Sequence, residues 1–420
     1  MAKGKFNIYV YADWIGLGGP TLMGVLSAHY GKGRKSFCFE YEPGWLKNKN
    51  RIVFDPDIEW YSGTQFPNNK ENFGVFLDSM PDTWGRTLMK RRAALESNEK
   101  TGRKILYDTD YLLGVYDESR MGALRFKLEP NGNFLDHSKV FSIPPWANIR
   151  ELQHAASVVE SDNSLDDVRK WLAVLIAPGS SLGGARPKAN IIDEKGNLWI
   201  AKFPSKNDII DKAKWEFLAY LIALDAKVNM AESVIQKVSG KYSTFFTKRF
   251  DRIGSQRIHF ASAMTMTGYS EDILREKDYM PSYLEIADFI STYGFNIDKN
   301  LHQLWRRIIF NIAVSNTDDH LRNHGFILKE KGWELSPAYD INPSTEKSGL
   351  ALNIDMDSNE LDYNLAFNVG KYFRLNKSEM EIIKEEVVSS VQKWKEIAKK
   401  LNISKSEINI MEAAFRIKLK

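Results

Sequence analysis

The first part of the chain combines a strand pattern with a stretch of helical periodicity. Polar and apolar residues alternate from Lys5 to Tyr11, which predicts a strand, and the glycines that follow, with Pro20, predict a turn. Between Asn72 and Leu95 the apolar residues recur at helical spacing, which predicts a helix with one buried face. We therefore expect a mixed α/β accessory domain over residues 1–130.

A second group of elements follows an irregular passage rich in turn residues, Glu129 to Pro145. The predicted elements are a helix from Ile149 to about Ala177, strands at Lys188–Asp193 and Asn197–Phe203, a helix from about Asp211 to Ala226, and a strand at Tyr242–Phe250. Together they predict a small β-rich lobe over residues 146–252.

The last part of the chain is predicted to be mostly helical. Leu304 to Val314 is strongly apolar, and two amphipathic stretches follow at Lys377–Leu401 and Lys405–Ile417. Residues 253–420 are therefore expected to form a helical lobe, which makes the fold class α+β with two lobes behind the accessory domain.

Composition narrows the class of protein. The 420 residues are 43% apolar and 27% charged, which is ordinary for globular proteins, and the net charge of +4 disfavours an autonomous nucleic-acid binder. Cys38 is the single cysteine, which excludes an intrachain disulfide and any site with several thiolate ligands. Since no stretch reaches the roughly 20 apolar residues that span a bilayer, we expect a cytoplasmic protein without a membrane partner.

The strongest chemical pattern follows the apolar stretch that ends at Val314. Residues 316–323 read Asn-Thr-Asp-Asp-His-Leu-Arg-Asn, so Asp318 lies five residues before Asn323, as in the catalytic loop of a kinase. In phosphoryl transfer an aspartate accepts the proton of the attacking hydroxyl, and a nearby asparagine holds magnesium. We predict Asp318 as the base and Asn323 as a metal ligand.

A second magnesium ligand is predicted at Asp340, after a predicted hairpin from Gly325 to Leu335. Taken singly, Asp318 could belong to a polar turn after a helix, and Asp340 could simply end a strand. Their order along the chain, downstream of a candidate phosphate lysine, favours phosphoryl transfer from ATP.

That lysine is Lys202, which lies among apolar residues in the second strand of the β-rich lobe. An unpaired ammonium is costly there, so we expect it to meet the ATP phosphates. Glu216 could hold Lys202 or belong to a solvated helix face. Phe250 and Asp251, at the end of the next strand, are expected at the adenine site, with an ordinary buried strand edge as the alternative.

A glycine-containing loop precedes the first strand of this lobe. Gly183 and Gly184 follow Ser180 and Ser181, and such glycines let backbone N–H groups approach a polyanion. The loop matches neither common phosphate-loop pattern, so a plain connector is the alternative.

Three blocks resemble the HipA family, the kinase toxins of bacterial toxin-antitoxin pairs. They are Ser-Leu-Gly-Gly-Ala-Arg-Pro-Lys ending at Lys188, Asn-Thr-Asp-Asp-His-Leu-Arg-Asn-His-Gly ending at Gly325, and Pro-Ala-Tyr-Asp ending at Asp340. Three further blocks are similar to the accessory region of that family: Ser79–Arg86, Leu113–Tyr116 and Met121–Phe126. The resemblance implies a protein-kinase-like fold and serine/threonine protein kinase activity with ATP and Mg²⁺.

The resemblance also implies roles for individual residues. Asp318 would be the catalytic base, His320 an ATP-site neighbour, Asn323 and Asp340 the magnesium ligands, Lys202 the phosphate lysine, and Ser181 the autophosphorylation site, with Ser180 as second choice.

Partners follow from the resemblance alone. It implies a small helix-turn-helix antitoxin of the HipB type, contact with DNA only through that antitoxin, and a protein substrate that in some members is an aminoacyl-tRNA synthetase. Two alternatives stay open: a kinase-fold enzyme acting on a small molecule or lipid, and a catalytically silent co-repressor.

Overall fold

The structure is a computed structural model that describes residues 4–31, 34–48, 51–96, 105–137, 143–161, 171–172, 174–175, 184–277 and 279–417. The chain forms two compact units. Unit 1 comprises Met1–Lys206, Asp251–Lys277 and Leu328–Glu330, and unit 2 comprises Asn207–Phe250, Asp278–Ile327 and Lys331–Lys420. Both contain helices and strands, so the predicted α+β class is confirmed. The three predicted domains, 1–130, 146–252 and 253–420, stay a prediction.

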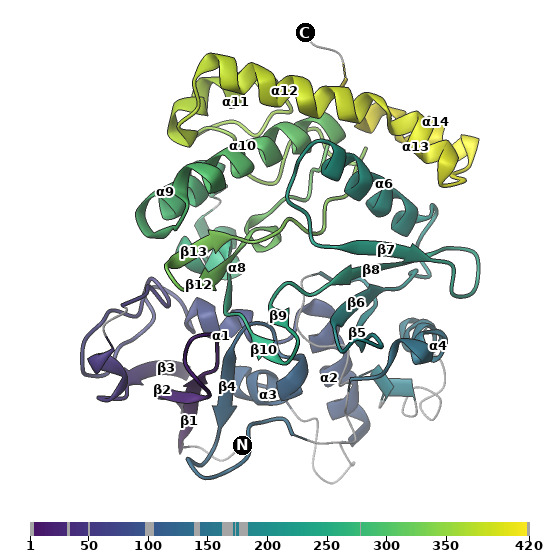
Figure 1. The fold of residues 1–420 in the computed structure, drawn as a ribbon. Helices are drawn as coiled ribbons and strands as arrows, with labels where there is room; N and C mark the ends of the chain where they lie inside the picture. Colours follow the sequence, from purple (N-terminus) through teal and green to yellow (C-terminus); the bar gives the residue numbers. More distant parts are fainter. Residues whose placement is uncertain are drawn as a thin grey trace. The chain divides into compact units, whose positions relative to one another are not determined.

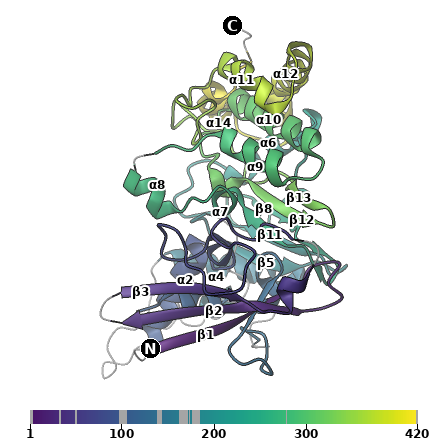
Figure 2. The same ribbon diagram turned by 90° about the vertical axis from the view of Figure 1, so that its left-hand side faces the viewer.

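Unit 1 contains an antiparallel sheet in the order β3-β2-β1-β4. Figure 2 shows β3, β2 and β1 of this sheet side by side. The strands are β1 (Gly4–Ala12), β2 (Thr21–Gly31), β3 (Arg34–Tyr41) and β4 (Leu124–Lys127). The strand predicted at Lys5–Tyr11 is therefore confirmed. Alternate residues of β1, such as Ile8 and Val10, are fully buried against aromatic side chains that include Phe39, Phe54 and Phe76. This burial gives the sheet one core face, as its alternating pattern requires.

The helices of unit 1 differ from the prediction at one point. The single helix expected over Asn72–Leu95 is wrong, because the chain forms α1 (Gly74–Asp78) and α2 (Thr83–Glu96) with Pro81 between them. Proline lacks an N–H donor and disfavours helical geometry in the preceding residue, so the helix stops there. The other helices are α3 (Asp108–Leu113), α4 (Ile149–Glu160), α7 (Ala263–Met266) and α8 (Glu271–Lys277), with 3-10 turns η1 (Trp45–Lys47), η2 (Asp117–Ser119) and η4 (Trp146–Asn148).

A separate hairpin in unit 1 carries the candidate phosphate lysine. Strands β5 (Lys188–Ile192) and β6 (Leu198–Lys202) pair antiparallel, and their register places Lys188 opposite Lys202. Both predicted strands are thus present within a residue or so of the expected limits. The remaining strands of unit 1 are β9 (Arg252–Ile253), β10 (Gln256–Arg257) and β11 (Phe260–Ser262).

Unit 2 is mostly helical and is organised around α10 (Ile297–Val314), which lies beside α9 (Tyr283–Tyr293) and α12 (Lys377–Gln392) (Figure 1). The last eight residues of α10 are all buried, so it is the core helix of the unit. The other elements are α6 (Lys212–Asp225), β7 (Ser233–Gln236), β8 (Thr244–Lys248), η5 (Leu321–Asn323), β12 (Gly325–Lys329), β13 (Gly332–Leu335), α11 (Tyr363–Val369), η6 (Gly370–Phe373), α13 (Trp394–Lys400), α14 (Lys405–Met411) and η7 (Glu412–Ala414).

A search of the described helices for membrane spans finds none that is both long and apolar enough to cross a bilayer.

Candidate active site

The candidate site begins where α10 ends. Ser315 caps the helix in the left-handed conformation, with φ of 50°, and this turns the chain into the loop that carries the predicted base. Two adjacent carboxylates then take opposite environments. The Asp318 side chain is 73% exposed, whereas the Asp319 side chain is 4% exposed. Of the two, Asp318 alone is accessible to a substrate.

Asp319 is bonded into the interior of unit 2. Its Oδ2 atom lies 2.6 Å from the Tyr283 hydroxyl, 2.5 Å from Nδ2 of Asn311 and 2.7 Å from Nε2 of His324. Burial raises the pKa of Asp319, but His324 and these hydrogen bonds outweigh it and hold that pKa below its ordinary value. The same burial, reinforced by the Asp319 carboxylate, raises the pKa of Tyr283 well above its ordinary value. Asp319 therefore anchors the loop as a carboxylate.

Asn323 closes the loop from its other end. Its side-chain Nδ2 donates to the main-chain oxygen of Asp318 at 2.8 Å, and its own main-chain N–H donates to His320 at 2.8 Å. The amide nitrogen of Asn323 is thus bonded within the loop, and the amide oxygen is the acceptor of the same group. That oxygen is the atom that a magnesium ion would require.

Asp340 lies in a strained segment bonded to this loop. Its backbone is left-handed, with φ of 58°, a conformation that costs free energy in residues other than glycine and that clusters at functional sites. The preceding Tyr339 donates its hydroxyl to the main-chain oxygen of Arg322 at 2.8 Å. The following Asn342 donates Nδ2 to Oδ1 of Asp340 at 3.1 Å. The predicted metal ligands Asn323 and Asp340 therefore belong to segments joined by direct hydrogen bonds.

Aromatic rings lie next to Asp340. The rings of Phe250 and Tyr339 are 5.7 Å apart and tilted by 31°. Tyr339 and Asp340 also line a cavity of about 10 Å³ that includes Glu216, which is 6% exposed. The alternative that Glu216 belongs to a solvated helix face is therefore wrong, because α6 packs that face into unit 2.

The other predicted site residues lie in unit 1. Lys202 is 9% exposed at the end of β6, and Gly184 has a φ of 96°, which favours glycine. Asp251 is fully buried, and its Oδ2 accepts hydrogen bonds from the Gly122 N–H at 2.8 Å and from Arg252 at 2.6 Å. Ser180, Ser181 and Gly183 lie outside the described residues.

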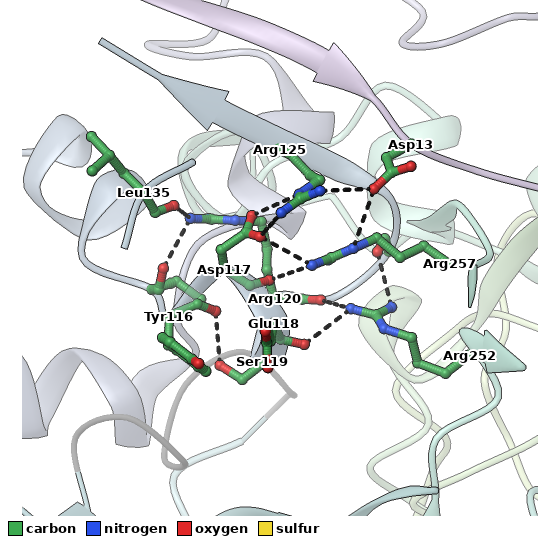
Figure 3. A network of polar contacts seen from close by, with 12 residues as sticks. Asp13, Tyr116, Asp117, Glu118, Ser119, Arg120, Arg125, Leu135, Arg252 and Arg257 are labelled. Carbon is green, nitrogen blue, oxygen red and sulfur yellow. Dashed lines mark hydrogen bonds and ion pairs between the residues drawn. The ribbon is translucent and has the colours of Figure 1, made fainter. Parts of the chain in front are cut away.

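Arg252, which bonds Asp251, also belongs to a larger polar network around Asp117 and Arg120 (Figure 3). Arg252 also donates to the main-chain oxygen of Arg120 at 2.6 Å. Arg125 and Arg257 both bond Asp117, at 2.5 and 3.3 Å. Burial lowers the pKa of Arg120 to about 9, and its guanidinium donates to four main-chain oxygens. The segment that follows Phe250 is thus held to the residues 117–125 by charge-assisted bonds.

Sequence reasoning missed a buried ion pair at the glycine loop. Nζ of Lys188 lies 2.9 Å from Oδ2 of Asp82 and 3.1 Å from the Gly184 oxygen, and both charged side chains are 5% exposed. Nε1 of Trp84 donates to the Lys188 oxygen at 3.0 Å. The signal available in the sequence was a lysine in an apolar strand, Lys188 beside Ala189, which needs a counter-charge when buried.

The predicted metal ligands, Asn323 and Asp340, supply two oxygen donors, which suits magnesium better than a metal whose ligands all come from the protein. No group of three or more His, Cys, Asp or Glu side chains arranged for a metal occurs among the described residues. Mg²⁺ characteristically uses one or two protein carboxylates and completes its shell with substrate phosphates and water. One carboxylate from Asp340 and one amide oxygen from Asn323 match that pattern.

Comparison with known proteins decides the family. The sequence pattern of the family described as HipA-like C-terminal domain matches residues 180–395, just over half of the chain. The chain belongs to the HipA-like family. All three motifs from which HipA resemblance was predicted lie within the matched residues, so that prediction is confirmed.

Two individual proteins extend the HipA-like assignment. A candidate kinase of Haemophilus influenzae is 26% identical over an alignment of 178 residues that covers 39% of this chain and 52% of that protein. The chain thus spans about half the length of this relative. HipA of Shewanella oneidensis, solved in a toxin-antitoxin complex with HipB and operator DNA, superposes with a TM-score of 0.66 over 97% of this chain and 94% of its own, at 17% identity. This likeness shows the HipA fold.

Proposed function

We propose that this HipA-like protein is an ATP- and magnesium-dependent serine/threonine protein kinase. The observation that carries the proposal is the pairing of an exposed Asp318 with a buried Asp319 in a loop bonded directly to the Asp340 segment. A base must reach its substrate while its main chain is held still, and this arrangement supplies both conditions.

In the proposed reaction Asp318 accepts the proton of a serine or threonine hydroxyl. The hydroxyl oxygen bonds to the γ-phosphorus of ATP while the bond from that phosphorus to the β,γ-bridging oxygen breaks, and ADP leaves with the bonding electrons. Lys202 would contact the ATP phosphates, and Asn323 and Asp340 would hold magnesium. Bound magnesium neutralises charge on the β- and γ-phosphates.

The nucleotide base is proposed to contact the rings of Phe250 and Tyr339, since paired aromatic rings bury a planar heterocycle well. His320 is proposed to lie near the phosphates because it follows Asp318 in the same loop. Asp251 is proposed to act by holding the main chain after Phe250, because its carboxylate is already bonded to Gly122 and Arg252.

Regulation and partners belong to the same proposal. We propose autophosphorylation on Ser181, with Ser180 as second choice, and a toxin role exerted through a protein substrate such as an aminoacyl-tRNA synthetase. The Shewanella complex contains HipB and operator DNA, which supports a small DNA-binding antitoxin as partner of this chain.

Intact-mass spectrometry with peptide mapping tests the proposal. The purified protein and its Asp318→Asn variant are incubated with ATP and magnesium. One added phosphate on Ser181 or Ser180 in the wild type, absent from the variant and from Ser181→Ala if Ser181 is the site, would support the kinase. An unmodified wild type that still binds ATP would instead favour a small-molecule kinase or a silent co-repressor.

A further inference from the structure

A row of three hydrogen-bonded asparagines, Asn311, Asn316 and Asn342, runs within unit 2 from the buried anchor Asp319 to the candidate metal ligand Asp340. Asn311 donates Nδ2 to Oδ2 of Asp319 at 2.5 Å and accepts, on Oδ1, a hydrogen bond from Nδ2 of Asn316 at 3.1 Å. Asn316 in turn accepts, on Oδ1, the main-chain N–H of Asn342 at 3.3 Å. The side chain of Asn342 then donates to Asp340 at 3.1 Å. Every link is a donor facing an acceptor.

Burial of the Asn311 and Asn316 side-chain amides costs free energy of folding. Asn311 is 1% exposed and Asn316 is fully buried, and Asn311 lies in α10 between Phe310 and Ile312, which are also fully buried. A buried amide lowers stability unless each of its polar atoms is bonded, whereas an apolar side chain at the same place would pack without that requirement. A satisfied buried network specifies one arrangement of the segments that it joins.

Amides suit the two central positions, Asn311 and Asn316. Each must donate on one side and accept on the other, since Asn311 faces a carboxylate on one side and an amide donor on the other. A carboxylate at either position would have no proton to donate at neutral pH, and an aliphatic side chain would offer neither group. These hydrogen-bonded amides therefore fix the Asp340 segment relative to Asp319.

We infer that Asn311 and Asn316 are positioning residues that, through Asn342, set Asp340 for magnesium. This inference rests on the proposed function, because it assigns a task to a magnesium site that the proposal introduces. Partners of metal ligands typically contribute about 10- to 100-fold to metal affinity or activity. The effect should therefore appear in metal-dependent nucleotide binding, before any phosphoryl transfer.

Calorimetry with adenylyl imidodiphosphate, an ATP analogue that cannot transfer its terminal phosphoryl group, measures this effect with and without magnesium. We expect Asn316→Ala to lose about 10- to 100-fold of the affinity gained from magnesium, while affinity without magnesium stays as in the wild type. The matched control is Asn300→Ala. Asn300 is a buried asparagine of α10 whose amide bonds Phe295 and Leu335, so its loss lowers stability without touching the bonded amides Asn311, Asn316 and Asn342.

Three outcomes are distinguishable. A wild type that gains no affinity from magnesium would refute the proposed function itself. A wild type that gains affinity, with Asn316→Ala equal to it or to Asn300→Ala, would overturn the inference alone. If Asn316→Ala does not fold, Asn342→Ala answers the same question, because Asn342 is only half-buried and its side chain makes the last bond to Asp340; an undiminished magnesium gain in that variant also overturns the inference.

Discussion

Oδ2 of Asp319 lies 2.7 Å from Nε2 of His324, and both side chains are almost completely buried. The two residues lie on either side of the segment 320–323, so this contact fixes both ends of the segment that directly follows Asp318 and Asp319. The two neighbouring carboxylates therefore have different roles. Asp319 holds the main chain, and Asp318 remains exposed.

Replacing the exposed carboxylate should separate catalysis from binding. Asp318→Asn is expected to lower the rate of phosphoryl transfer by about 10²–10⁴-fold, because a general base is lost while the amide keeps the shape of the side chain. ATP affinity and the midpoint of unfolding in urea should stay as in the wild type, since the side chain is 73% exposed. Single-turnover assays and calorimetry measure the two effects. Full activity in this variant would remove Asp318 from the role of base.

Replacing the buried carboxylate should instead unfold the site. Asp319→Ala leaves Tyr283, Asn311 and His324 without their common acceptor, and a hydrogen bond to a charged group contributes about 1.5–3 kcal/mol. The free energy of unfolding in urea should fall by more than the value of one such bond, because three are lost. Tyr283→Phe removes a single hydrogen bond to the carboxylate and should cost about 1.5–3 kcal/mol. Equal stability of Asp319→Ala and the wild type would contradict the anchoring role.

Removing the proposed metal carboxylate should weaken binding of the magnesium–nucleotide complex. Asp340→Asn keeps a residue type that tolerates the left-handed backbone but supplies a neutral ligand, so any loss reports on the charge. We expect nucleotide affinity to fall with magnesium and to stay unchanged without it, as measured by calorimetry. Asp362→Ala is the control, because Asp362 only caps α11. An equal loss in both variants would argue against a metal role for Asp340.

The ion pair between Asp82 and Lys188 should contribute to stability in a way that surface pairs do not. Asp82→Asn leaves the Lys188 ammonium buried without its counter-charge, so we expect a loss of about 3–5 kcal/mol in the free energy of unfolding. Adding Lys188→Met should recover part of this loss. Glu412→Gln, which breaks the exposed pair with Lys395, should cost about 1 kcal/mol or less. Additive effects of the two buried substitutions would show that Asp82 and Lys188 do not interact.

Acid should destabilise unit 1 through His259. This imidazole is buried between the rings of Trp14 and Phe54, and burial lowers its pKa to about 3. The unfolded chain binds a proton near pH 6.5 and the folded chain does not, so the contribution of His259 to stability is lost as pH falls from about 6.5 toward 3.

The slope is at most about 1.4 kcal/mol per pH unit for one group. His259→Phe keeps an aromatic ring and should be less sensitive to acid than the wild type over that range. Unfolding in urea at several pH values measures the difference, and parallel curves for the two proteins would assign the acid sensitivity to other groups.

The sequence by itself determined the local elements and the spacing of the candidate chemistry. Alternation predicted β1, two short runs joined by a turn predicted β5 and β6, amphipathic periodicity predicted α6, and a strongly apolar stretch indicated the second half of α10. All of these patterns depend on neighbours a few residues away. The five-residue spacing from Asp318 to Asn323 was likewise readable, and the family match supports the motif that contains it. Even the break between α1 and α2 had a local signal in Pro81, which the apolar periodicity concealed.

Only the tertiary structure decided what each polar residue contacts. Asp318 and Asp319 are adjacent and chemically identical in the sequence, and their opposite environments depend on Tyr283, 36 residues away, and on the packing of α10. Lys188 finds its counter-charge 106 residues away. Burial and ion pairing depend on which distant segments pack together. A pattern of neighbouring residues does not determine that packing.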